Sequence, residues 1–427
     1  MHEGDSRDGG ALTPPAGPSD RPAPPPGNRA PGWFRVWLTY LVVTALSAMA
    51  GVGATLAVQH LTAPGPGAPG MARAAAADRP GAMNYEAVYA AVEPGVVDVT
   101  ANLRYLQEMA KGTGFVIDAA AGLILTNNHV INGATSVTVT PVTSGRSYPA
   151  RILGYDRADD IALLQVRGVP RLKAVAIGSS SRVRVGTPVL AIGNEAGQGG
   201  SPTVAPGVIS GLGRTIVASD QSSGLTETLR GMMQTSADIR PGDSGGPLAG
   251  ADGRVIGIDT AAGGNTVYSG YVIPIDQAMP IARQIAAGRQ GARVQVGLPA
   301  FLGVLLPDST STSPQRQAGQ ELHQTGAVSR SGSGCTSGDT TATPASIAPA
   351  GSGALVDGVL CGTPAAQAGL FAGDVIISIG GHAVTSPGSL TALVSRCRPG
   401  TQVALAWVAP GGSLHTAVVT LAAGPAG

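Results

Sequence analysis

The chain has 427 residues, of which 43% are apolar, and its 27 Lys and Arg residues nearly balance its 26 Asp and Glu residues. This length corresponds to two or three domains. The net charge of +1 argues against a nucleic-acid-binding protein with a broad basic surface, and also against a wholly disordered polyelectrolyte. The three cysteines form no CxxC pair, which excludes a disulfide-dense scaffold and a cysteine-based zinc module.

The N-terminal part of the chain changes composition twice. Residues 1–32 are rich in Pro, Gly, Asp and Arg without periodicity, which predicts a disordered tail. An uncharged, mostly apolar segment follows, and about 20 such residues span a bilayer. We therefore predict a transmembrane helix over residues 33–60 that anchors the protein in the lipid bilayer. Residues 61–82 are expected to form a flexible linker.

A cleavable signal peptide is the alternative interpretation of the apolar segment. Signal peptides have apolar stretches of about 7–15 residues, shorter than the one found here. More arginines precede the segment than follow it closely, so the positive-inside rule places the tail in the cytoplasm. The expected topology is a single-pass protein of the cell membrane with its bulk on the extracytoplasmic side.

Short runs of β-forming residues, separated by Gly, Pro and Asn, fill the chain from residue 83 to residue 273. This pattern predicts an all-β sandwich or a pair of barrels. The clearest strands are expected at residues 114–118, 122–126, 136–140, 161–166, 187–193 and 254–259. An amphipathic helix from Ile275 to Ala287, stopped by Gly288, closes a domain that we assign to residues 83–288.

A second domain is predicted at residues 295–422, with strands and a helix near Ser389–Cys397. Residues 307–353 are dense in Ser, Thr, Gly and Gln and are expected to form a disordered insertion. All three cysteines lie in the second domain: Cys335, Cys361 and Cys397. In an exported domain two of them can bridge in three ways, and the sequence does not choose among these pairings.

Three segments of the first domain carry residues suited to nucleophilic catalysis. Ser244 stands in RPGDSGGPL, where glycines leave the backbone open to a ligand. A serine nucleophile needs a base, and His129 in LTNNHVI is the domain's only histidine. A carboxylate must orient the imidazole. Asp159 and Asp160 in DRADDIALL both qualify by spacing, although only one can point at His129 because strand residues alternate in direction.

Taken in the order His, Asp, Ser, these motifs resemble those of trypsin-like serine peptidases, and most closely the HtrA/Deg branch. The resemblance implies a mainly β, chymotrypsin-like double β-barrel of two six-stranded barrels, followed by an α+β PDZ domain. It implies the catalytic residues His129, Asp160 and Ser244, because the family's Asp directly precedes the Ile-Ala-Leu strand. It implies no metal and no cofactor.

The same resemblance places an oxyanion hole at the backbone N–H groups of Gly242 and Ser244, with Asp243 as a further donor. A peptide flip at Gly242 would switch this hole off. Family members usually carry Asn before the serine. The digestive enzymes carry Asp, as this chain does, and pair it with a new N-terminus, so Asp243 needs another partner, for which Arg240 is a candidate.

Asp238 lies six residues before Ser244, at the offset of the acidic residue that selects basic side chains in trypsin-like enzymes. HtrA-like proteins instead favour small aliphatic side chains. We therefore expect cleavage after Val or Ala, with cleavage after Arg or Lys as the alternative through a specificity pocket at Asp238.

In the second domain the run Phe301, Leu302, Gly303 and Val304 resembles the loop with which PDZ domains bind a peptide's C-terminal carboxylate. The strand after it would pair with the peptide by β-augmentation. The predicted insertion lies in this groove region and is atypical of such domains.

The sequence thus predicts a membrane-anchored serine endopeptidase that cleaves unfolded, damaged or regulatory envelope proteins in protein quality control and stress response. Its partners would be polypeptide substrates and a C-terminal peptide ligand, with no nucleic acid, and the resemblance implies a homotrimer. The alternative is a catalytically silent PDZ-bearing adaptor or chaperone on a protease-derived scaffold.

Overall fold

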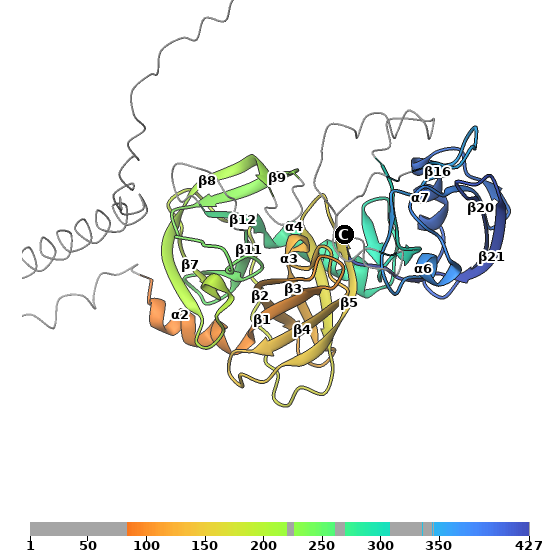
Figure 1. Cartoon of the computed structure of the whole chain (residues 1–427). Coiled ribbons are helices and arrows are strands. Elements are labelled where there is room, and N and C mark those ends of the chain that lie inside the picture. Colours follow the sequence, from red (N-terminus) through yellow and green to blue (C-terminus); the bar gives the residue numbers. More distant parts are fainter. Residues whose placement is uncertain are drawn as a thin grey trace, which may run out of the picture. The chain divides into compact units, whose positions relative to one another are not determined.

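A computed structural model describes residues 83–219, 226–260, 270–307, 335, 344 and 346–426 (Figure 1). The chain divides into two units, residues 1–79 and 80–427, and the described residues all belong to the second. The predicted tail, anchor and linker at residues 1–82 lie outside the described residues. Within the described ranges, no helix combines the length and apolar character needed to cross a membrane.

The first domain begins with a short helix and a closed antiparallel barrel. Helix α2 (Tyr85–Val92) and a 3-10 turn (Glu93–Gly95) lead into the first strand. The barrel strands are β1 (Val96–Leu103), β2 (Glu108–Asp118), β3 (Leu123–Thr126), β4 (Ser136–Pro141), β5 (Tyr148–Asp156) and β6 (Ile161–Val166). They follow the order β5-β4-β1-β2-β3-β6, and β5 pairs with β6 to close the barrel.

A late strand joins this barrel from beyond the first domain's expected end. Strand β13 (Val294–Val296) pairs with β5 and extends the same sheet. Residues 295 and 296, which open the second domain in the sequence-based division, therefore lie in the sheet of the first barrel.

The second barrel is also closed and antiparallel. Its strands are β7 (Pro188–Gly193), β8 (Thr203–Ser219), β9 (Thr226–Thr235), β10 (Pro247–Gly250), β11 (Val255–Thr260) and β12 (Gly270–Pro274). Helix α4 (Ile275–Ala286) follows, and Gly288 adopts φ +66°, a left-handed conformation typical of the residue after a helix. The predicted double barrel and the predicted helix are both confirmed.

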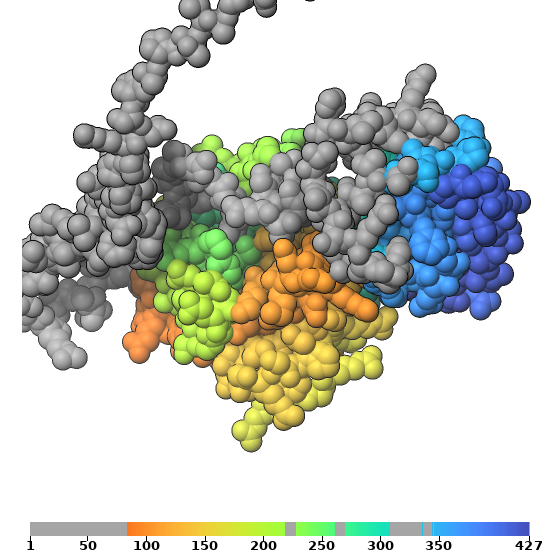
Figure 2. All heavy atoms as spheres, in the orientation of Figure 1, coloured from red at the N-terminus to blue at the C-terminus, as the bar shows by residue number. Residues whose placement is uncertain are grey.

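A single apolar core links the two barrels. Phe115 and Leu125 of the first barrel pack in one cluster with Leu190 and Ile258 of the second and Ile285 of α4, and all of them are buried. Figure 2 shows atoms of the first barrel, in orange to yellow, packed directly against atoms of the second, in green. Burial of apolar surface at about 25 cal/mol per Å² fixes the seam between the barrels, where the candidate site lies.

The second domain is a small α+β fold. Its pairings are β14 (Ala300–Phe301) with β22 (Ala422–Ala423), β15 (Val304–Leu305) with β17 (Gly358–Val359), and the sheet of β16 (Ala354–Leu355), β18 (Val375–Ile379), β19 (His382–Ala383), β20 (Gln402–Val408) and β21 (Leu414–Thr420). Helices α6 (Pro364–Ala368) and α7 (Pro387–Ser395) pack on it. Helix α7 starts two residues before the predicted one because Ser386 caps it through the Ser389 N–H and Pro387 stands at its first position.

The C-terminal edge of the predicted insertion is ordered into this fold. Ala348 and Ala350 are buried, and the Ala348 N–H donates to the Gly373 carbonyl. The cysteine pairing that the sequence left open is a disulfide between Cys335 and Cys361, which leaves Cys397 as a free thiol.

Candidate active site

His129 and Asp160 form a tight pair in the first barrel. His129 stands on the single-turn helix α3 (Asn128–Ile131), directly after β3, and Asp160 directly precedes β6. The His129 Nδ1 lies 2.8 Å from Asp160 Oδ2, and the His129 backbone N–H donates to Asp160 Oδ1 over 2.9 Å. A carboxylate can only accept, so Nδ1 carries the proton and Nε2 is left as the base.

The neighbouring carboxylate is engaged elsewhere, which resolves the choice that spacing left open. Asp159 accepts from Gln277 Nε2 over 3.0 Å and pairs with the Arg293 guanidinium. Asp160 is 1% exposed and has φ +53°, a costly conformation that the surrounding hydrogen bonds hold in place.

Asn127 supports the His129–Asp160 pair, a role that the sequence motifs did not indicate. Its side-chain amide donates to the Asp160 carbonyl over 2.9 Å, and its Oδ1 accepts from the Thr260 hydroxyl of the second barrel over 3.4 Å. An Asn before a helix indicates an N-cap. Here the side chain makes no cap bond and binds a residue 33 positions away, a contact that no local pattern reveals.

The Ser244 loop of the second barrel lies against the strands that lead to His129. The Ser244 carbonyl accepts from the Thr113 N–H over 2.8 Å. A Cβ added at Gly112 would lie 3.0 Å from the Ser244 carbonyl oxygen and 2.7 Å from Val130, the residue after His129. Residues far apart along the chain thus meet at the seam, and Ser244 is 5% exposed there.

The backbone contacts around Gly242 set the direction of its N–H group, which is a predicted donor of the oxyanion hole. Gly242 has φ +102°, and the Pro241 carbonyl accepts from the Ala196 N–H over 2.8 Å. Because C=O and N–H point in opposite directions in a trans peptide, the Gly242 N–H points away from Ala196. The Asp243 N–H donates to the Arg240 carbonyl over 2.9 Å, so this predicted third donor is engaged and the candidate hole consists of Gly242 and Ser244.

Asp243 finds its partners in the backbone and in a hydroxyl. Its Oδ2 accepts from the Arg240 backbone N–H over 2.9 Å, and its Oδ1 accepts from the Thr203 hydroxyl over 3.1 Å. The predicted partner is therefore the right residue, acting through its main chain. Burial raises the pKa of Asp243, and these two hydrogen bonds oppose the shift.

The Arg240 guanidinium pairs with the candidate specificity residue, Asp238. Asp238 Oδ2 accepts from Arg240 Nε over 2.9 Å and from Nη2 over 2.6 Å, and the same guanidinium also pairs with Glu195. The hydrogen bonds that the guanidinium donates to Asp238, and next those to Glu195, raise the pKa of Arg240. Asp238 is thus already paired with a cationic side chain of its own loop.

Two further carboxyl groups lie buried near these loops. Burial, together with the charge of Asp243, raises the pKa of the fully buried Asp259 well above its usual range. Burial raises the pKa of Asp98 to about 6, against a hydrogen bond from Asn194 and the charge of Lys111. Their only sequence signal is an acidic residue inside an apolar strand run.

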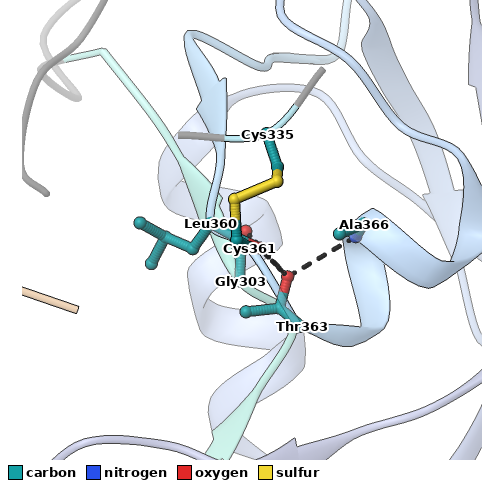
Figure 3. Close-up of a disulfide and its surroundings, with 6 residues drawn as sticks. All are labelled: Gly303, Cys335, Leu360, Cys361, Thr363 and Ala366. Atoms are coloured by element: carbon teal, nitrogen blue, oxygen red, sulfur yellow. Dashed lines mark hydrogen bonds between the residues drawn. A yellow bond between two sulfur atoms is a disulfide. The ribbon is translucent and has the colours of Figure 1, made fainter. Parts of the chain in front are cut away.

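In the second domain, the predicted carboxylate-binding loop is supported by one neighbouring turn (Figure 3). Gly303 has φ +87°, and a Cβ there would overlap Thr363. The Leu360 N–H donates to the Gly303 carbonyl over 2.9 Å, and the Thr363 hydroxyl donates to the Leu360 carbonyl over 2.6 Å. Cys361, in the same turn, is covalently bound to Cys335. Leu302 is buried, whereas Phe301 and Val304 are partly exposed.

A double β-barrel with a His–Asp pair and a glycine-rich serine loop at its seam defines a chymotrypsin-like serine peptidase fold. Residues 112–258 match the trypsin-like peptidase domain family, and residues 320–419 match the PDZ domain family. The run at residues 301–304 precedes the matched part of the PDZ domain.

The chain is 31% identical over 423 residues to the serine protease PepD of Mycobacterium tuberculosis, covering 93% of this chain and 80% of PepD. It is 34% identical over 312 residues to the periplasmic pH-dependent serine endoprotease DegQ of Escherichia coli, and 35% identical over 287 residues to the putative serine protease HhoA of Synechocystis. These matches cover 72% and 67% of this chain, but only 58% of DegQ and 64% of HhoA. The chain belongs to the HtrA/Deg family of serine proteases, as its motifs predicted.

Proposed function

We propose that the protein is a serine endopeptidase that hydrolyses peptide bonds through an acyl-enzyme on Ser244. The observation that carries this proposal is the meeting of the His129–Asp160 pair with the Ser244 loop at the seam of the two barrels. The intact pair is what catalysis needs and what a silent adaptor would not require, so the geometry favours the enzyme.

The reaction follows from the placement of these groups. His129 Nε2 takes the proton of Ser244 Oγ as the oxygen attacks the substrate carbonyl carbon, and Asp160 stabilises the imidazolium. The carbonyl oxygen becomes an anion that accepts from the N–H groups of Gly242 and Ser244. The C–N bond then breaks, the amine leaves with the proton from His129, and water hydrolyses the ester by the same steps.

The substrates that we propose are unfolded, damaged or regulatory polypeptides of the cell envelope, cleaved after small aliphatic side chains. The ion pair that Asp238 forms with Arg240 supports this preference. The PDZ domain would bind a peptide's C-terminal carboxylate at residues 301–304. The apolar composition of residues 33–60 supports a single membrane anchor with both domains on the extracytoplasmic side, and the family resemblance supports a homotrimer.

The test uses the full-length chain and an unfolded protein substrate. Ser244→Ala should lower the rate of hydrolysis by roughly a thousandfold or more, because removal of the nucleophile leaves only residual catalysis. Ser236→Ala, at an exposed serine of the same barrel, is the matched control and should keep the wild-type rate. Hydrolysis that survives in a folded Ser244→Ala variant would refute the proposal.

A further inference from the structure

The buried hydroxyl of Thr113 connects Asn194 with Gly242 in the oxyanion loop, which is the loop of residues 241–244 that carries the candidate oxyanion hole. Thr113 lies on β2 between two glycines and is 0% exposed. Its Oγ1 accepts from the Asn194 N–H over 2.9 Å and donates to the Gly242 carbonyl over 2.7 Å. An amide N–H can only donate and a carbonyl can only accept, so the direction of both hydrogen bonds is fixed.

The two peptide planes that flank Gly242 are each held by a hydrogen bond. The carbonyl of the preceding plane, from Pro241, accepts from Ala196 in the 3-10 turn η2 (Glu195–Gly197). The carbonyl of the following plane, from Gly242 itself, accepts from Thr113. With both carbonyls held, neither plane can flip without breaking a hydrogen bond.

Strand β2 also anchors the turn that faces the oxyanion loop. Lys111 Nζ donates to the Gly197 carbonyl over 2.9 Å, and the Thr113 hydroxyl receives the Asn194 N–H at the start of the same turn. The Thr113 backbone N–H holds the Ser244 carbonyl as well. A single strand of the first barrel therefore fixes two segments of the second.

We propose that Thr113 is a positioning residue for the oxyanion hole, whose hydroxyl holds the Gly242 carbonyl so that the loop's donors face the developing anion. The inference rests on the proposed peptidase function. A glycine backbone has wide conformational freedom, and donors stabilise a transition state only when they are oriented before the reaction. The hydroxyl of Thr113 supplies that restraint.

Replacement of Thr113 by valine keeps the shape but removes the hydroxyl, and leaves a buried C=O and N–H without their partner. The peptide plane between Gly242 and Asp243 is then free to rotate, and its carbonyl can turn toward other donors. Because a direct oxyanion donor is worth roughly 100-fold to 1000-fold in kcat, we expect Thr113→Val to lower kcat by about 10-fold to 100-fold with little change in KM. Thr113→Ser keeps the hydroxyl and should retain kcat within about threefold of wild type.

The experiment measures kcat and KM of the full-length variants on a peptide substrate, with thermal unfolding beside them. Thr235→Val is the matched control, because Thr235 is 1% exposed and its hydroxyl also accepts from an N–H (Ala237) and donates to a carbonyl (Val208). It should lower the unfolding midpoint about as much as Thr113→Val while kcat stays near the wild-type value. Lys111→Met, at an exposed side chain, should fold normally and lower kcat by about threefold or more.

The outcomes separate this inference from the proposed function. A wild-type chain that hydrolyses no peptide contradicts the proposed function itself. A hydrolysing wild type overturns the role of Thr113 if folded Thr113→Val keeps the wild-type kcat, if Thr113→Ser is as slow as Thr113→Val, or if Thr235→Val is equally slow. Should Thr113→Val fail to fold, a folded Thr113→Ser with a kcat at least about tenfold below wild type overturns it, because this variant keeps the hydroxyl.

Discussion

Each of the two domains presents a glycine turn whose backbone we assign to a ligand, and the two turns are held in different ways. Gly242 and Gly303 both have positive φ, +102° and +87°, and neither has room for a Cβ. At Gly242 an added Cβ would overlap the Asn194 carbonyl, and at Gly303 it would overlap Thr363. Each position thus requires glycine for two reasons, the positive φ and the lack of space for a side chain.

The difference lies in the support. Hydrogen bonds from separate segments hold the Gly242 turn: Thr113 from β2, Ala196 from the η2 turn, and the Arg240–Asp243 contact within the loop. One neighbouring turn, cross-linked through Cys361, holds the Gly303 turn. A catalytic turn must be oriented before the reaction, and here that orientation depends on both barrels. The Gly303 turn, which we assign to peptide binding, depends on one neighbouring turn that a disulfide cross-links.

The largest effect should follow a change at Gly242. Gly242→Ala forces a Cβ against the Asn194 carbonyl in a strained conformation, which moves the Gly242 N–H. Loss of one oxyanion donor lowers kcat by roughly 100-fold to 1000-fold. Steady-state kinetics should show this loss, while peptide binding to the PDZ domain stays unchanged. A variant with wild-type kcat would show that the Gly242 turn does not act on the anion.

Removal of the Cys335–Cys361 disulfide should weaken the support of the Gly303 turn and leave that of the Gly242 turn intact. A bridge between residues 26 apart stabilises by about 3.5 kcal/mol in the chain-entropy account. Cys335→Ser with Cys361→Ser should therefore lower the free energy of unfolding of the PDZ domain by about that amount in urea titrations. The kcat for a short peptide should not change, and a parallel loss of kcat would break the contrast between the two turns.

Part of the pH dependence of stability should arise near the Gly242 turn, through Asp98. Burial raises the pKa of Asp98 to about 6, whereas an unfolded chain has an Asp pKa near 3.9. The native state therefore binds more protons between these values, and the contribution of Asp98 to stability is present below about pH 4 and lost as pH rises through 6.

Over that interval the loss amounts to about 2–3 kcal/mol. The measurement is the difference in unfolding free energy between wild type and Asp98→Asn, at pH 4 and at pH 7. Other titrating groups contribute equally to both proteins, so the change in this difference isolates the contribution of Asp98. Wild type should lose that amount relative to the variant as pH rises. A constant difference, or one of opposite sign, would contradict the effect of burial on this carboxyl.

The smallest effect is expected at Gly303. Gly303→Ala pushes the loop off Thr363 and should weaken binding of a free C-terminal peptide by about tenfold, the cost of one misplaced hydrogen bond to a charged group. Calorimetry with the peptide and with its C-terminal amide measures the change. The amide should bind weakly to both proteins, and equal affinity of the free acid for both would place the carboxylate elsewhere.

The sequence predicted the features that local patterns encode. The β-runs, the helix ended by Gly288 and the motifs around His129 and Ser244 were visible, and the family resemblance chose Asp160 over Asp159. The supports were not visible, because Thr113 and Gly242 are 129 positions apart. The glycines on either side of Thr113 were a signal, since glycine in a strand marks the close approach of another backbone.

Two edges of the second domain depend on contacts that local patterns do not reveal either. Residues 294–296 join β5 only through tertiary pairing, and residues 346–353 pack into the second domain around Ala348 and Ala350. The apolar segment at residues 33–60 lies outside the described residues and stays a prediction.

The central claim is that Ser244 is an activated nucleophile. A fluorophosphonate probe reacts with such serines, and intact mass spectrometry of the full-length chain measures its attachment directly. We predict a single covalent adduct on Ser244, absent in Ser244→Ala and greatly slowed in His129→Ala. A wild-type chain that stays unlabelled, or that labels equally after Ser244→Ala, would contradict the account.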